Sequence, residues 1–154
     1  MYRKIRVLIA EDDPNDVVLL KHAFQKAGVN TPLGFVSDGQ EAVDYLAGSN
    51  SYSDRTRHPL PHLMLLDIKM PRFGGFDVLK WLRTQPGLRR LPVIMFSSSS
   101  EQRDVDRAHE LGANGYAVKP TSPDGMHAVV LGLEAFWLRV HLYPDCETTR
   151  RTSA

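Results

Sequence analysis

The chain has 154 residues, of which 42% are hydrophobic and 24% charged, and its formal net charge is +1. This balance is typical of one globular domain with a full-sized core, and it excludes a disordered chain and a strongly basic nucleic-acid-binding protein. No apolar run approaches the roughly 20 residues that a membrane-spanning helix needs. The single cysteine, Cys146, excludes an internal disulfide. We therefore expect a cytoplasmic protein with no membrane segment.

The first strand is predicted over residues 6–10, where four apolar residues follow a basic start. Three acids, Glu11, Asp12 and Asp13, come directly after it. Pro14 stands where a helix accepts proline, so Asp13 is the expected N-cap. One acid would satisfy the positive end of that helix. Three acids at a strand end repel one another and favour a bound cation.

A weaker second strand is predicted over residues 32–36, followed by a helix that ends at Gly48. The polar residues 49–61 are expected to form a long, mobile surface loop. Four consecutive apolar residues, 63–66, then lead to Asp67, and this run indicates a central strand buried on both faces. Asp67 would lie at the carboxyl end of that strand, the edge at which ligands bind in open α/β sheets.

The second half of the chain continues the alternation of helix and strand. The further elements are predicted as helix 76–85, strand 91–96, helix 101–111, strand 115–118 and a last helix over residues 126–140. One of the serines before residue 101 is the expected cap of the helix that follows. Residues 1–144 are expected to form one domain with an extended last helix, and residues 145–154 a flexible tail.

Five strands that alternate with helices, with no two strands adjacent in sequence, predict a doubly wound parallel sheet with helices on both faces. The flavodoxin-like strand order 2-1-3-4-5 suits five such units, and its switch point lies between the first and third strands. The acids after the first strand and Asp67 after the third would therefore meet at one edge.

The side chains at that edge suit phosphoryl transfer. Carboxylate oxygens are the ligands that Mg²⁺ prefers. An aspartate can act as the nucleophile and form an aspartyl phosphate, while a metal ion and a lysine such as Lys119 neutralise the transferred group. A serine hydroxyl can hydrogen-bond a phosphoryl oxygen, and no base is needed because a carboxylate is already ionised near neutral pH.

This set of residues resembles that of two-component response-regulator receiver domains. The resemblance covers roughly residues 4–133 and rests on these positions: Glu11, Asp12, Asp67, Lys69, residues 71–75, Ser97, Tyr116, Lys119 and Pro120. Each motif is common by itself. Their order, and their places at successive strand ends, make the set specific.

The resemblance implies a role for each position. Asp67 would be the phosphoacceptor. Asp12 would bind Mg²⁺ directly and Glu11 through water, while Asp67 and the backbone carbonyl of Lys69 would complete the protein ligands.

The same resemblance implies a switch. Ser97 would be the switch hydroxyl, Tyr116 the switch aromatic, and Lys119 the partner of the phosphoryl group. The Lys119–Pro120 bond would be cis, a state largely confined to proline.

A narrower resemblance concerns residues 54–61 and 135–144, which are similar to those of single-domain response regulators paired with bacterial phytochromes. It implies a histidine-kinase partner of the bacteriophytochrome kind, and a homodimer through the last helix and the C-terminal extension. The apolar surplus near Phe136 and Trp137 supports an interface. The alternative is a tail folded back on its own domain. Too few residues follow for an attached DNA-binding domain, so no DNA contact is expected.

Two other functions compete with the receiver interpretation. An aspartate-nucleophile phosphohydrolase normally carries a second acid two residues after the nucleophile, but Lys69 occupies that position, so we do not expect an enzyme. A phosphate-independent, receiver-like protein-binding module would have lost an acid or the lysine, and here all are present.

Overall fold

The computed structural model describes residues 4–146 of the chain. Five strands form one sheet in the order β2-β1-β3-β4-β5, and every neighbouring pair is parallel. The strands are β1 (Val7–Ala10), β2 (Leu33–Val36), β3 (Leu63–Leu66), β4 (Val93–Ser97) and β5 (Gly115–Val118). The predicted sheet and strand order are confirmed.

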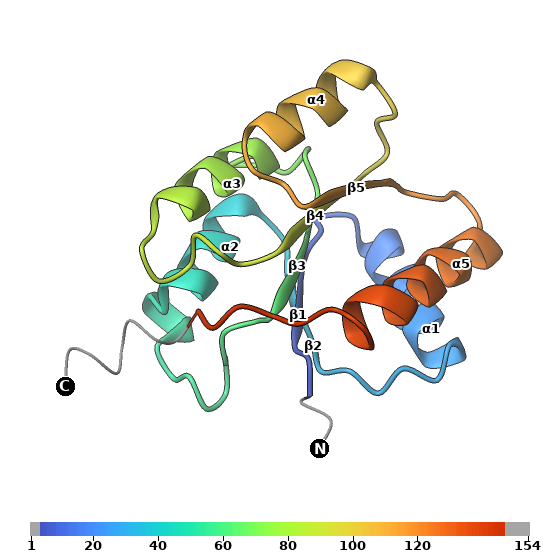
Figure 1. Cartoon of the computed structure of the whole chain (residues 1–154), viewed down its shortest axis with the longest axis horizontal. Helices are drawn as coiled ribbons and strands as arrows, with labels where there is room; N and C mark the ends of the chain where they lie inside the picture. The colour runs from blue at the N-terminus through green and yellow to red at the C-terminus, as the bar shows by residue number, and fades with distance from the viewer. Residues whose placement is uncertain (1–3, 147–154) are drawn as a thin grey trace.

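Helices cover both faces of the sheet (Figure 1). They are α1 (Pro14–Lys26), α2 (Gly39–Ala47), α3 (Gly75–Thr84), α4 (Gln102–Glu110) and α5 (Pro123–Leu133). Helices α1 and α5 contact each other on one face, while α2 and α3 contact each other on the opposite face, which α4 also covers. Within residues 4–146, no helix combines the length and the apolar character that crossing a bilayer requires.

The core has two layers because successive side chains of a strand point to opposite faces of the sheet. In β1, Leu8 and Ala10 pack in the layer with α2 and α3, whereas Val7 and Ile9 pack in the layer with α1 and α5. Strand β3 divides its four buried residues in the same way. Burial on both faces explains why these strands are continuous apolar runs.

The helix starts follow local chemistry, with one departure from prediction. Asp13 caps α1, and its Oδ1 accepts a hydrogen bond from the backbone N of Asn15 at 2.8 Å. The expected serine cap of α4 is wrong, because Glu101 is the N-cap and makes no capping bond through its side chain. The Ser99 hydroxyl instead donates to Asp104 at 2.6 Å and accepts from the Glu101 backbone N at 3.2 Å, but Ser99 stands two residues before the cap position.

The loop over residues 49–61 is tied to α2. It contains the short helical turn η1 (Asn50–Tyr52). The Tyr52 hydroxyl donates to Glu41 in α2 at 2.5 Å. The Arg55 guanidinium donates to two backbone carbonyls at the end of α2, at 2.7 and 2.8 Å. These bonds hold the loop against α2, although we expected it to be mobile.

A π-helical turn, η2 (Glu134–Leu138), continues directly from α5. The chain then reverses, and the Tyr143 hydroxyl donates to the Trp137 carbonyl at 2.6 Å. The Tyr143 ring also contacts His62, before β3, with centroids 5.9 Å apart. The segment that follows η2 is thus folded back on its own domain, which was the alternative reading of the apolar surplus.

Asp145 and Cys146, which we assigned to the tail, lie against the domain. The Asp145 carbonyl accepts from Arg90 at 2.8 Å, and Cys146 packs beside the layer of α2 and α3. Residues 147–154 of the predicted tail lie outside the described residues.

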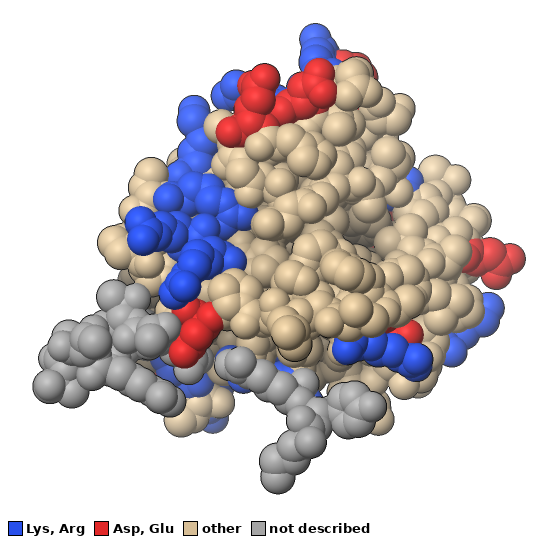
Figure 2. Space-filling view, viewed as in Figure 1, with Lys and Arg blue, Asp and Glu red and all other residues tan. Residues whose placement is uncertain are grey.

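Apolar surface remains after the chain folds back. Phe136, Val140 and Leu142 are 49%, 65% and 91% exposed. Figure 2 shows that the middle of this face of the molecule, over β5 and α5, carries few charged side chains. Strand β5 and the end of α5 therefore present the domain's least charged surface in this view.

Candidate functional site

Acids from two strands meet at the carboxyl edge of the sheet. Glu11 and Asp12 follow β1, Asp67 follows β3, and one carboxylate oxygen of each lies within 4.8 Å of the others. The Asp67 backbone N donates to the Ala10 carbonyl at 3.2 Å, which fixes the two strand ends side by side. Glu11 and Asp67 are buried, whereas Asp12 is exposed. The structure thus brings together the acids that the strand order predicts as neighbours.

Lys119, directly after β5, reaches into this group of acids. Its Nζ lies 2.9 Å from Asp67 Oδ2 and 3.2 Å from Asp16 Oδ2, and it also forms an ion pair with Glu11. Only 9% of the lysine side chain is exposed. Lys119 therefore contacts carboxylates from α1, β1 and β3 at once.

The site carries more negative than positive charge. Four carboxylates gather here, those of Glu11, Asp12, Asp16 and Asp67, and the Lys119 ammonium forms ion pairs with three of them, Glu11, Asp16 and Asp67. Burial raises the pKa of Glu11 to about 7. Burial alone would lower the pKa of Lys119, but its hydrogen bonds with Glu11 and Asp67 raise that pKa above its usual value.

A divalent cation would offset this excess of negative charge. An all-oxygen ligand set with one exposed acid suits Mg²⁺ or Mn²⁺, which keep part of their water shell. Glu11, Asp12 and Asp67 form the one cluster of potential metal ligands found within residues 4–146. The residues present therefore fit the ion that the sequence predicts.

Ser97 is the last residue of β4, and Tyr116 lies on β5. Ser97 is buried at the end of β4, and its Oγ accepts from the backbone N of Ser99 at 3.2 Å. The Tyr116 hydroxyl donates to the Ser99 carbonyl at 2.8 Å. The Lys119 backbone N donates to the Ser97 carbonyl at 2.8 Å. These bonds connect the loop after β4 to the strand that carries Lys119.

Two expectations for the loops have different outcomes. The backbone N of Lys69 lies 3.4 Å from Asp67 Oδ1, and the role of the Lys69 carbonyl as a metal ligand stays a prediction. The Lys119–Pro120 bond is trans, so the expectation of a cis bond is wrong. The two isomers before proline differ by only about 0.5–1 kcal/mol, so the dipeptide alone does not decide between them.

Comparison with known proteins bears on this geometry. The family model of the response regulator receiver domain matches residues 7–131. The chain belongs to the response regulator receiver domain family. The matched range includes Glu11, Asp12, Asp67 and Lys119, whose individual roles stay predictions.

Several receiver proteins are similar over nearly the whole chain. Response regulator Rcp1 of Synechocystis is 30% identical over 138 residues, which are 90% of this chain and 92% of Rcp1. The crystal structure of its Mn²⁺-bound form superposes with a TM-score of 0.81 at 29% identity, covering 91% of this chain and 99% of that one.

Two further solved structures are similar. The phosphorylated cyanobacterial phytochrome response regulator RcpA has a TM-score of 0.85 at 29% identity, covering 93% of this chain and all of that one. Response regulator RPA3017, in red light signaling of R. palustris, has a TM-score of 0.86 at 36% identity, with 91% and 98% of the two chains covered.

Sequence reasoning missed two features of this receiver site. Asp16, which contacts Lys119, stands three residues after the cap Asp13, a position where an acid often serves the helix start, and that spacing was the available signal. The role of Gly75 was also missed. A Cβ at Gly75 would lie 1.9 Å from the Asp67 carbonyl oxygen, so only glycine lets α3 begin against the backbone of Asp67.

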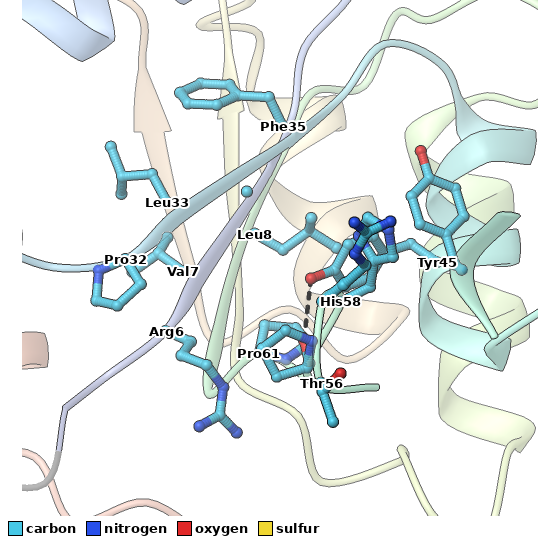
Figure 3. A pocket seen from close by; sticks show the side chains of 14 residues that line it. Arg6, Val7, Leu8, Pro32, Leu33, Phe35, Tyr45, Thr56, His58 and Pro61 are labelled. Carbon is cyan, nitrogen blue, oxygen red and sulfur yellow. Dashed lines mark hydrogen bonds between the residues drawn. The ribbon is translucent and has the colours of Figure 1, made fainter. Parts of the chain in front are cut away.

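A hollow in the domain lies away from the acids. It has a volume of about 520 Å³ between β2 and the loop over residues 49–61, with Gly34, Tyr45 and His58 among its lining residues (Figure 3). None of the residues lining it is acidic. The hollow therefore takes no part in the carboxylate site.

Proposed function

We propose that the chain is a phosphoacceptor response regulator, in which Asp67 receives a phosphoryl group from a partner histidine kinase. The observation that supports this proposal best is the environment of Asp67. Its carboxylate is buried at the carboxyl edge of the sheet, 2.9 Å from the Lys119 ammonium and within 4.8 Å of Glu11 and Asp12. That arrangement combines a nucleophile, a cation and a ligand set for a metal ion.

The proposed reaction is a direct displacement at phosphorus. An Asp67 carboxylate oxygen forms a bond to the phosphorus of a phosphohistidine while the bond from phosphorus to the imidazole nitrogen breaks. The electron pair of the broken bond stays on the imidazole. The step needs no base, because a carboxylate nucleophile has no proton to lose. Lys119 offsets the charge of the phosphoryl oxygens from its position beside Asp67.

We also propose that Mg²⁺ is the metal ion of this site. Glu11, Asp12, Asp67 and the Lys69 carbonyl would hold it, and the ion would neutralise charge on the transferred group. The Mn²⁺-bound form of Rcp1 supports a divalent ion in a related protein. The unbalanced charge of the acid cluster supports one here.

Phosphorylation would act through Ser97, Tyr116 and Lys119. A phosphoryl group on Asp67 would attract the Lys119 ammonium and the Ser97 hydroxyl, since both are donors at the same edge. A shift of Ser97 would move the Ser99 carbonyl, to which the Tyr116 hydroxyl is bonded at 2.8 Å. The surface of α4, β5 and α5 would then change its packing.

We propose a bacteriophytochrome-type histidine kinase as the partner, acting in the cytoplasm, and a role as phosphoacceptor rather than enzyme. The supporting observation is similarity along nearly the full chain to RcpA, a phytochrome response regulator, and to RPA3017, which functions in red light signaling. The acids and Lys119 are all in place, so nothing favours a phosphate-independent binding module.

The proposed homodimer would use the apolar surface after α5. Phe136, Val140 and Leu142 remain exposed although the following segment folds back. Light scattering after gel filtration should give twice the chain mass for the wild type and the monomer mass for Phe136→Glu. Tens of micromolar is a usual concentration for testing such weak interfaces. A wild type that is still monomeric at that concentration would contradict the dimer.

The test of phosphorylation is intact-mass spectrometry after addition of acetyl phosphate, with and without Mg²⁺. The wild type should gain one phosphate only when Mg²⁺ is present, and Asp67→Asn should gain none. A wild type that stays unlabelled, under conditions that label a control receiver, would contradict the proposal.

A further inference from the structure

A pair of charged residues fastens the loop that follows Asp67. This loop, residues 68–74, joins β3 to α3. Arg72 donates to Asp38 Oδ2 from Nη2 at 2.6 Å and from Nε at 3.2 Å. Asp38 is also the N-cap of α2, and its Oδ1 accepts from the Glu41 backbone N at 2.8 Å. One carboxylate therefore joins the start of α2 to the loop beside the phosphoacceptor.

The backbone of Arg72 needs such a restraint. Its φ is +67°, in the left-handed region that residues with a Cβ rarely adopt. A residue persists in this region when its surroundings hold it there. The two hydrogen bonds to Asp38 provide that hold; the Asp38 side chain is 13% exposed, whereas that of Arg72 is 66% exposed. Burial alone would raise the pKa of Asp38, but its bonds with Glu41 and Arg72 keep that pKa below its usual value.

Close backbone contacts connect this pair to Asp67. A Cβ at Gly39, next to Asp38, would lie 1.7 Å from the Phe73 carbonyl oxygen, so the start of α2 touches the loop directly. Two residues after Phe73, Gly75 leaves the same kind of space against the Asp67 carbonyl. A displacement of the loop would therefore reach Asp67 through backbone atoms, without a flexible side chain to absorb it.

We propose that Arg72 and Asp38 are positioning residues for phosphoryl transfer: their ion pair holds residues 68–74 so that Lys69 and the Asp67 carboxylate keep their places relative to Lys119. This inference rests on the proposed function of Asp67. Neither residue contacts the reacting atoms. Both act through the loop, and small misplacements of reacting groups lower rates strongly.

Two substitutions separate the ion pair from other roles of these residues. Arg72→Gly removes the guanidinium but accepts the positive φ, so it introduces no backbone strain. Asp38→Asn keeps an oxygen that can cap α2 but loses the charge. Arg57→Gly is the matched control, because Arg57 is an exposed arginine in a loop remote from Asp67.

The measurement is the rate of labelling by acetyl phosphate, with the Mg²⁺ dissociation constant determined in parallel. Each single variant should label about three- to tenfold more slowly than wild type and bind Mg²⁺ more weakly, with the midpoint of urea unfolding little changed. The double variant should resemble either single variant, because both remove the same interaction. Arg72→Lys should recover part of the rate, and Arg57→Gly should match wild type.

Hydrogen exchange separates this inference from the function on which it rests. Amides of residues 68–74 should exchange faster in Arg72→Gly and Asp38→Asn, whether or not the protein is phosphorylated. The positioning role would be overturned if both variants showed the hydrogen exchange and the Mg²⁺ affinity of the wild type. It would also be overturned if the rate losses of the single variants added in the double variant. An unlabelled wild type would instead overturn the phosphoacceptor proposal, and the exchange and Mg²⁺ data would still decide the role of the pair.

Discussion

The ammonium of Lys119 lies 2.9 Å from the carboxylate of Asp67, although 52 positions separate the two residues in the chain. The contact exists because parallel strands β3 and β5 end at the same edge of the sheet. Among the ion pairs of residues 4–146, Lys119 is also the one cation that contacts the buried carboxylates of Glu11 and Asp67. Its loss should therefore affect both stability and chemistry.

We expect Lys119→Met to lower the free energy of unfolding by about 3 kcal/mol without Mg²⁺, because buried carboxylates would lose their partner. Saturating Mg²⁺ should restore part of this loss, and labelling by acetyl phosphate should still be slower than in the wild type. Urea unfolding with and without Mg²⁺ measures the first effect. Equal stability of variant and wild type without Mg²⁺ would refute it.

The affinity for Mg²⁺ should depend on pH through Glu11. Burial raises the pKa of Glu11 to about 7, so below this pH the folded protein binds a proton that Mg²⁺ must displace. The dissociation constant should rise by up to about tenfold per pH unit as the pH falls below 7. Calorimetry in buffers of different ionisation enthalpy would count the released proton. Glu11→Gln should weaken the pH dependence of the Mg²⁺ affinity. Identical Mg²⁺ affinities of the wild type at pH 6 and pH 8 would contradict the prediction.

The same shift predicts how stability without metal depends on pH. Because the folded pKa of Glu11 lies above the unfolded value of 4.5, the folded state holds the extra proton between these pH values. This group therefore favours folding at pH 4.5 and below, and its contribution is lost as the pH rises through about 7. The pH slope of urea unfolding, compared between wild type and Glu11→Gln in EDTA, isolates this contribution.

Glycine 75 offers a test of packing at the site. Gly75→Ala places a Cβ 1.9 Å from the Asp67 carbonyl oxygen and should cost about 2–4 kcal/mol of stability. Gly132→Ala, in α5, meets no atom within 4 Å and should stabilise the helix by up to about 1 kcal/mol. Thermal unfolding of both variants makes the comparison. A loss in Gly132→Ala as large as that in Gly75→Ala would show that the contact at Asp67 is not the cause.

Tyr116→Phe removes the hydroxyl that donates to the Ser99 carbonyl at 2.8 Å. We expect labelling within about twofold of wild type, because the hydroxyl does not contact Asp67, and a stability loss of about 1 kcal/mol. The change in hydrogen exchange of α4 on phosphorylation should become smaller. An undiminished response of α4 in the variant would exclude Tyr116 from the switch.

Strand positions and the meeting of the acids could be predicted because each depends on local pattern. Strand β3 is a continuous apolar run, and Asp67 follows it, so the strand order alone places Asp67 beside Glu11 and Asp12. The N-cap Asp13 was predictable from the proline after it. The predicted site residues Ser97 and Lys119 likewise lie at strand ends that the pattern located.

Other features depend on contacts that no local pattern encodes. The loop over residues 49–61 reads as polar and mobile, yet Arg55 and Tyr52 bind α2 through partners that only the folded chain supplies. The fold-back of Tyr143 against Trp137 depends on the direction of the chain after η2. Arg72 and Asp38 are 34 positions apart and lie in two different loops, so the sequence offered no sign of their pairing.

The central claim is that one carboxylate, that of Asp67, accepts the phosphoryl group. Borohydride reduction after labelling with acetyl phosphate and Mg²⁺ converts an aspartyl phosphate to homoserine, which peptide mass mapping locates. We predict homoserine at position 67 in the wild type and none in a sample that received no acetyl phosphate. Homoserine at another aspartate, or a labelled protein with Asp67 intact, would contradict the assignment.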